Sequence, residues 1–93
     1  MTTIVTHLRI RGRVQGVGYR AWFMYQAEAR GLSGWVRNRV DGSVEALVAG
    51  DAERVSSLIE AAHEGPRWSR VESVDREEAL EFPDAGFRVE GTI

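Results

Sequence analysis

The chain has 93 residues, no cysteine, an apolar fraction of 43% and a net charge of −2. This composition is typical of one folded domain, residues 1–93, and it excludes a disordered chain, disulfide stapling and thiolate metal sites. No apolar run reaches the ~20 residues of a membrane span, and the start of the chain lacks the features of a secretory signal, so we expect a cytoplasmic protein without a membrane partner.

The first predicted element is a strand over residues 6–12, where apolar and polar residues alternate. After a glycine-rich loop, residues 20–30 are expected to form a helix, which Gly31 ends because glycine is favoured just beyond a helix C-terminus. Residues 32–39 then alternate in character again and predict a second strand.

The Asp-Gly pair at residues 41–42 predicts a tight hairpin turn into a third strand over residues 44–49. Asp51 is a good N-cap for a second helix, and the Gly-Pro pair at residues 65–66 ends it. The apolar residues of this helix recur at the spacing i, i+3, i+4 and i+7, the clearest helical signal in the chain: Val55, Leu58, Ile59 and Ala62.

A fourth strand is predicted over residues 69–78, with Val71 and Val74 facing inward. A turn at residues 83–86 leads to a short terminal strand over residues 87–90. The order βαββαβ plus one strand predicts an α+β fold of the ferredoxin-like type. It would have an antiparallel sheet with two helices on one face, plus a short fifth C-terminal strand.

Residues 12–20, Gly-Arg-Val-Gln-Gly-Val-Gly-Tyr-Arg, are the most informative segment. Its three glycines allow backbone N–H groups to turn toward one point, at the positive end of the following helix. Arg20 can add a bidentate guanidinium, so the segment predicts a site for phosphate or another oxyanion. A glycine-rich strand-to-helix turn with a solvated arginine is the alternative. The spacing fits neither the Walker pattern nor the dinucleotide-binding fingerprint.

The excess of positive charge and a second candidate site residue, Asn38, both lie in the N-terminal half of the chain. Residues 1–39 hold seven arginines and one acid, a balance of +6, whereas residues 40–93 hold five arginines and thirteen acids, a balance of −8. The basic half indicates an anionic ligand, although an accidental surface distribution would look the same. In this half Asn38 supplies a neutral amide that could lie beside the loop; a polar strand end leading into the hairpin is the alternative.

Two segments resemble the signatures of the acylphosphatase family. Residues 12–20 are similar to its first signature. Residues 34–50 are similar to its second: Gly-Trp-Val-Arg-Asn, three residues, Gly-Ser-Val, five residues and Gly. The family's size and order of elements fit residues 4–90. The resemblance implies metal-independent hydrolysis of small acyl phosphates to a carboxylate and inorganic phosphate, without a cofactor.

The resemblance also assigns roles to individual residues. Arg20 matches the family's phosphate-binding arginine, and Asn38 matches the asparagine that orients the attacking water. Tyr19 stands where the family commonly has phenylalanine, which leaves open how its hydroxyl group is buried. The backbone of the following residues is expected to bind the substrate phosphate: Gln15, Gly16, Val17, Gly18 and Tyr19.

Other functions fit the sequence less well. RNA-recognition domains share this element order but carry aromatic residues on their central strands, whereas residues 44–49 have none and include an acid. A regulatory acylphosphatase-like domain of a larger maturation enzyme would be followed by further domains, and the chain ends at Ile93. We therefore expect a freestanding monomeric enzyme with no nucleic-acid partner.

The isolated His7 and His63 predict no metal site. The strand arginines are expected to be solvated: Arg9, Arg11, Arg13, Arg37 and Arg39.

Overall fold

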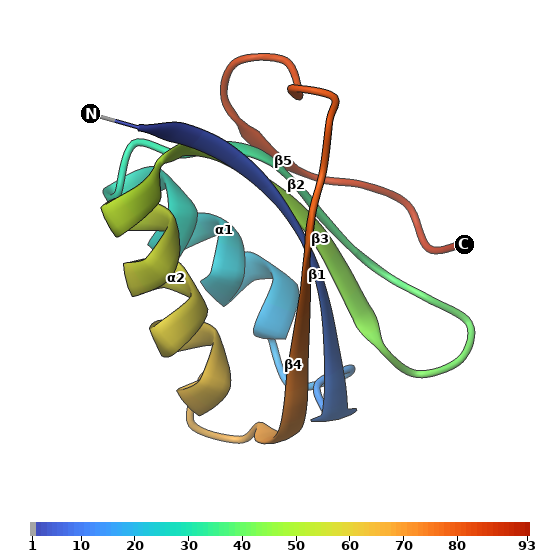
Figure 1. Cartoon of the computed structure of the whole chain (residues 1–93). Coiled ribbons are helices and arrows are strands. Elements are labelled where there is room, and N and C mark those ends of the chain that lie inside the picture. Colours follow the sequence, from blue (N-terminus) through green and yellow to red (C-terminus); the bar gives the residue numbers. More distant parts are fainter. Residues whose placement is uncertain (1) are drawn as a thin grey trace.

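In the computed structural model, which describes residues 2–93, two helices lie against one face of a five-stranded sheet (Figure 1). The ferredoxin-like order predicted from the sequence is confirmed, and the first strand begins a few residues earlier than expected. The elements are β1 (Thr3–Arg13), α1 (Tyr19–Ala29), β2 (Ser33–Asn38), β3 (Val44–Asp51), α2 (Ala52–Glu64), β4 (Arg70–Glu78) and β5 (Phe87–Val89).

The strands lie in the order β4-β1-β3-β2-β5. The four long strands are antiparallel neighbours, as predicted, but β5 pairs in parallel with β2 through Val36 and Val89. The sheet is therefore mixed. The physical reason is the connection after β4, which carries the chain from one edge of the sheet to the other, so that β5 enters beside β2 in the same direction (Figure 1).

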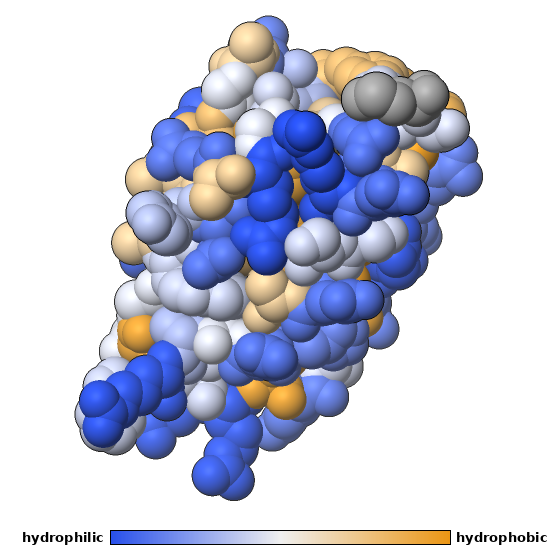
Figure 2. Space-filling model, turned by 90° about the vertical axis from the view of Figure 1, so that its left-hand side faces the viewer, coloured by the Kyte–Doolittle hydropathy of each residue, from blue (hydrophilic) through white to orange (hydrophobic). Residues whose placement is uncertain are grey.

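Side chains of the strands alternate between a face that the helices cover and a face that no helix of the described chain covers. The apolar residues that predicted the second helix all lie in the core between the sheet and the helices. Figure 2 looks onto the helical side, where mostly hydrophilic side chains surround scattered apolar ones. The core residues of 0–1% exposure are Leu8, Ile10, Val14, Tyr19, Phe23, Ala27, Val36, Val44, Ala46, Val48, Val55, Leu58 and Ala62.

A bulge in β4 explains how Val71 and Val74 both pack against the core. Residues three apart in a regular strand face opposite sides. Here Arg11 pairs with Ser73 while the next residue, Gly12, pairs with Val71, so one residue of β4 is left over. The bulge thus allows both predicted inward residues to face the core.

The N-termini of both helices lack a side-chain cap. Asp51 occupies the N-cap position of α2, as predicted, but its side chain makes no capping hydrogen bond. Gly18 occupies that position in α1. Within residues 2–93, neither helix is long and apolar enough to cross a membrane.

Candidate active site

The loop between β1 and α1 is held at both ends by buried side chains. Val14 and Tyr19, at its start and just beyond its end, are each 1% exposed. Between them Gly16 and Gly18 adopt φ angles of 72° and 78°, in the left-handed region that favours glycine. A Cβ atom on either glycine would meet no atom within 4 Å. The loop backbone is therefore anchored in the core and open on its outer side.

The backbone amides of this loop are unpaired. From Gln15 to Ala21, no amide donates a hydrogen bond to an acceptor within residues 2–93, and the first helical bond runs from Trp22 N to Gly18 O at 3.1 Å. Unpaired amides at a helix N-terminus, together with the helix dipole, favour a bound anion. These amides are therefore available to donate hydrogen bonds to an anion.

Arg20 lines a cavity of about 250 Å³ beside the loop. Its guanidinium makes no ion pair and no hydrogen bond with any residue in the described part of the chain, so its donors and its charge are free for a ligand. Val89 of β5 closes another side of the cavity, a contribution that the sequence did not indicate. The lining residues are Val14, Gly16, Gly18, Tyr19, Arg20, Ala21 and Val89.

Gln15 ties the loop to the hairpin that follows β2. Its Nε2 atom donates to the backbone carbonyls of Arg39 and Ser43, each at 2.8 Å. The two carbonyls lie on the two sides of the hairpin, and Arg39 directly follows Asn38. The side chain of Gln15 is thus a positional link that no local pattern could reveal.

Asn38 is the last residue of β2, and it pairs with Val44 of β3. Its Oδ1 atom is buried and has no hydrogen-bond partner in the described chain. An unpaired buried acceptor is costly unless a ligand or water satisfies it. The structure gathers Gly16, Gly18, Tyr19 and Arg20 around the cavity, whereas Gln15, Val17 and Asn38 do not line it.

The hydroxyl of Tyr19 is accommodated inside the core. It donates a 2.8 Å hydrogen bond to the carbonyl oxygen of Ala62 in α2. Burial raises the pKa of the Tyr19 phenol far above its ordinary value, so the group stays neutral. The hydroxyl therefore links the two helices by a hydrogen bond, and it does not act as an acid or base.

The expectation that the strand arginines are solvated is wrong for three of them. The side chains of Arg9, Arg37 and Arg39 are only 23%, 22% and 30% exposed, and all three approach the carboxylate of Glu45. Arg11 pairs instead with Asp75 at 2.6 Å. Strand register brings these partners together, and the only hint in the sequence was an acid within the apolar third strand.

Glu45 is negatively charged despite its burial. Burial by itself raises the pKa of its carboxyl group, but hydrogen bonds from His7, Arg37 and Arg39 outweigh this effect and lower the pKa to about 2. The uncovered face of the sheet thus contains a fixed anion surrounded by cations.

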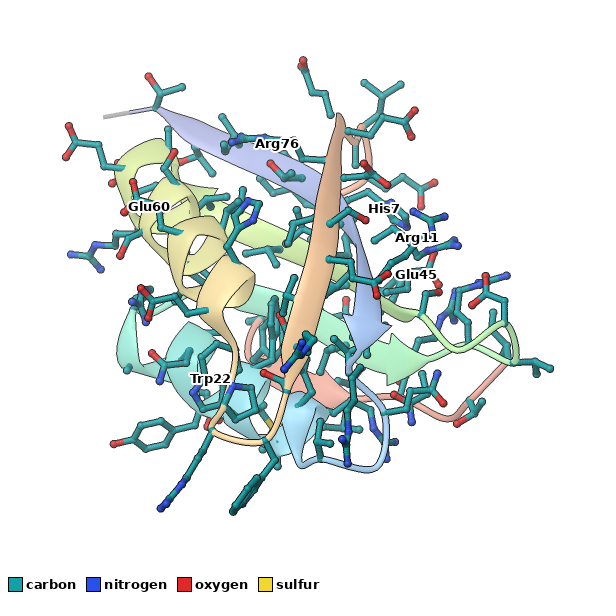
Figure 3. All side chains as sticks on the ribbon, turned by 90° about the horizontal axis from the view of Figure 1, so that it is seen from below. His7, Arg11, Trp22, Glu45, Glu60 and Arg76 are labelled. Atoms are coloured by element: carbon teal, nitrogen blue, oxygen red, sulfur yellow. The ribbon has the colours of Figure 1, made fainter. Side chains whose placement is uncertain are left out.

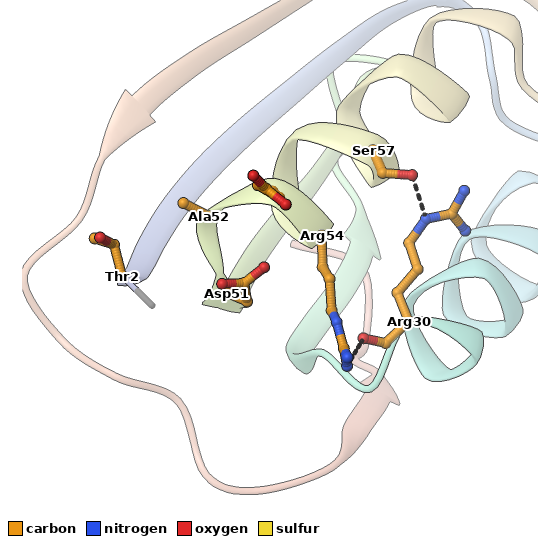
Figure 4. Close-up of a pocket in the computed structure, with 7 residues that line it drawn as sticks. Thr2, Arg30, Asp51, Ala52, Arg54 and Ser57 are labelled. Carbon is orange, nitrogen blue, oxygen red and sulfur yellow. Dashed lines mark hydrogen bonds between the residues drawn. The ribbon is translucent and has the colours of Figure 1, made fainter.

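A larger cavity, of about 560 Å³, lies at the opposite end of β1, around the N-terminus of α2 (Figure 4). Its two arginines are engaged by protein atoms: Arg30 Nε donates to Ser57 Oγ at 3.0 Å, and Arg54 Nη1 donates to the Arg30 carbonyl at 3.4 Å. Asp51 and Glu53 also line it and oppose an anion. The smaller cavity beside Arg20 is therefore the better candidate for a phosphate.

Comparisons with known proteins agree over nearly the whole chain. The family model described as Acylphosphatase matches residues 6–89. An acylphosphatase of Azorhizobium caulinodans is 53% identical over 94 residues, covering 98% of this chain and 99% of that protein. One from Bradyrhizobium diazoefficiens is 57% identical over 79 residues, covering 85% of this chain and 80% of that protein. The solved structure of an acylphosphatase from Coxiella burnetii has a TM-score of 0.91 at 34% identity and covers 95% of this chain and 93% of that chain.

Proposed function

The chain belongs to the acylphosphatase family and is a hydrolase of acyl phosphates, and on this basis we propose how its residues carry out the reaction. The loop amides and Arg20 bind the phosphoryl group. Asn38 orients the attacking water. The reaction needs no metal ion and no cofactor.

Hydrolysis of an acyl phosphate does not require a strong general acid or base. The water oxygen forms a bond to phosphorus while the bond from phosphorus to the acyl oxygen breaks. The products are a carboxylate and dihydrogen phosphate, which keeps both protons of the water. Because the leaving carboxylate is weakly basic, the protein has mainly to neutralise the phosphoryl oxygens and align the water.

The observation that carries the proposal is the run of unpaired amides from Gln15 to Ala21 beside the unpaired guanidinium of Arg20. Amide donors and a helix N-terminus suit the equatorial phosphoryl oxygens, whose charge must be neutralised in the transition state. Arg20 adds two parallel donors in a fixed fork, which fixes orientation as well as charge.

Asn38 suits the water because its amide is neutral. The Oδ1 atom can accept a hydrogen bond from the water, but a carboxamide is too weak a base to deprotonate it. The burial of Oδ1 without a protein partner supports this role. Gln15 supports it as well, because its two bonds fix the hairpin directly after Asn38 relative to the phosphate loop.

The test is release of phosphate from acetyl phosphate and benzoyl phosphate in the presence of a chelator. We expect Arg20→Ala and Asn38→Ala each to lower turnover by about 10²–10³-fold, the usual cost of losing a preorganised donor or acceptor. Arg76→Ala is the matched control, because Arg76 is exposed on β4 and lies away from the loop (Figure 3). Full activity of either site variant, with circular dichroism unchanged, would refute these roles.

We further propose that the chain acts as a single domain and a monomer in the cytoplasm, without a nucleic-acid partner. The resemblance and the small reacting group support this proposal. Light scattering should give the mass of one chain, 10.4 kDa. Salt-dependent binding of single-stranded RNA at low micromolar concentration would contradict it.

A further inference from the structure

Glu45 is the second residue of β3 and lies on the uncovered face of the sheet, close to His7 (Figure 3). It is only 7% exposed. Its Oε1 atom accepts hydrogen bonds from Arg37 Nε at 2.8 Å and Arg39 Nη1 at 2.9 Å. Its Oε2 atom lies 2.6 Å from His7 Nε2 and 3.8 Å from Arg9 Nη2. One carboxylate therefore joins side chains from β1, from β2 and from the residue that follows β2.

The two arginines bound to Oε1 flank Asn38 in the sequence. Because side chains alternate along a strand, Arg37 and Arg39 point to the uncovered face and Asn38 points to the opposite face. A single oxygen atom of Glu45 thus binds the side chains of the residues on both sides of Asn38. The carboxylate lies across the sheet from the Asn38 amide and does not touch it.

The other oxygen of Glu45 extends this link to the phosphate loop. It contacts His7 on β1, the strand that leads into the loop, and Gln15 of the loop binds the backbone carbonyl of Arg39. The strand that ends at Asn38 is therefore linked to β1 through Glu45, and the residue after it is linked to the loop through Gln15. The relative placement of the water-orienting amide and the phosphate loop depends on both.

General stabilisation is a weak explanation for this arrangement. A buried ion pair often contributes no more to stability than an apolar residue of similar size, because removing charges from water is costly. Positioning is a better explanation, because the buried Oδ1 of Asn38 has no protein partner to direct it. Its direction then depends on the backbone beneath it, and catalytic groups tolerate displacements of only about 0.5 Å.

We infer that Glu45 is a positioning residue for Asn38: by holding Arg37 and Arg39 from the far face of the sheet, it sets the direction of the Asn38 amide. The inference rests on the proposed role of Asn38. It predicts that loss of the carboxylate impairs the orientation of water, and therefore turnover, while substrate binding by the loop and Arg20 persists.

The test is Glu45→Gln, which keeps the size of the side chain and removes its charge. We expect kcat to fall about tenfold or more, the usual range for a group that orients another, while KM changes by less than about threefold. Glu45→Gln also leaves the charges of Arg37 and Arg39 unneutralised. If this change in electrostatic potential were the main effect, it would change KM, and the change would become smaller at high salt. Asp75→Asn is the matched control, since it breaks the Arg11 ion pair on the same face, away from Asn38, and should leave kcat unchanged.

A double-mutant cycle separates positioning from structural damage. In the Asn38→Ala background, Glu45→Gln should cause no further loss of kcat, because the group that it positions is gone. An equal loss in both backgrounds, or an unchanged kcat in Glu45→Gln alone, would overturn the inference. Full activity of Asn38→Ala would overturn the proposed role of Asn38 and this inference with it.

A second variant covers the case in which Glu45→Gln does not fold. The double variant Arg37→Gln/Arg39→Gln keeps the carboxylate and removes both hydrogen bonds to Oε1. We expect the same direction of change, a lower kcat at similar KM. An unchanged kcat in this folded variant would overturn the inference.

Discussion

The hydroxyl of Tyr19 supplies the hydrogen bond that Pro66 cannot. The carbonyl oxygen of Ala62 lies in the last turn of α2, and if the helix continued it would pair with the amide of residue 66, but that residue is Pro66, which has no N–H. Tyr19 donates to this carbonyl at 2.8 Å from the first residue of α1. The end of one helix is thus satisfied by the start of the other.

Removing this hydroxyl should destabilise the protein. We expect Tyr19→Phe to lower the free energy of unfolding by about 1–3 kcal/mol, because a buried carbonyl is left without a donor. Tyr25→Phe is the control, since Tyr25 lies on the same helix and is 68% exposed. Urea unfolding of both variants measures the difference. Equal stability of the two variants would show that the hydrogen bond contributes nothing net.

The geometry of Arg20 should matter as well as its charge. Arg20→Lys keeps the positive charge but loses the paired donors of the guanidinium. We expect kcat/KM to fall about 10- to 100-fold, the value of one hydrogen bond between charged groups, and inhibition by inorganic phosphate to weaken. Arg76→Lys should change neither quantity. Wild-type kinetics for Arg20→Lys would mean that a point charge suffices.

The link made by Gln15 can be tested with two substitutions. Gln15→Ala removes the bonds to Arg39 and Ser43, and we expect a lower kcat as the hairpin loses its connection to the loop. Gln15→Glu should be worse at neutral pH, because a carboxylate would face two carbonyl oxygens without a proton to share. Steady-state kinetics of the pair decides the matter; a more active Gln15→Glu variant would contradict this account of the contact.

Two glycines with positive φ should respond differently to alanine. Gly86 has a φ of 88° and open space around a Cβ, so Gly86→Ala should cost only the backbone strain of about 1–2 kcal/mol. At Gly12, with a φ of 126°, a Cβ would meet the Arg70 carbonyl oxygen and lie 2.7 Å from Glu72 N, both in the bulged strand. We expect a further loss of about 1–3 kcal/mol there. Thermal unfolding compares the two, and similar melting temperatures would argue against the bulge.

The depressed pKa of Glu45 should appear in the acid stability of the protein. The folded carboxyl group has a pKa of about 2, against an ordinary value of 4.5. As the pH falls through this window, the unfolded chain takes up a proton before the folded one does, and stability is lost. Above pH 4.5 the contribution is present in full. The free energy of unfolding of the wild type should therefore fall relative to that of Glu45→Gln as the pH is lowered through this window. Denaturant unfolding across this range measures it, and a constant difference would contradict the pKa.

The sequence by itself determined the local features. The alternation of apolar and polar residues predicted the strands, and the helical spacing of apolar residues predicted the helices, because both patterns depend only on residues close together in the sequence. The glycines of the loop and Arg20 indicated an anion site for the same reason, since a strand-to-helix turn brings consecutive amides together. Two signatures then pointed to the family and to Asn38.

Tertiary structure alone decided which distant side chains meet. His7 and Glu45 are 38 residues apart and Tyr19 and Ala62 are 43 residues apart, so their contacts depend on strand register and helix packing rather than on local pattern. The parallel pairing of β5 likewise depends on where a long connection crosses the sheet. Arginines that alternate along a strand have the same pattern whether they face water or a buried carboxylate, and only the neighbouring strand, which places Glu45 beneath them, distinguishes the two.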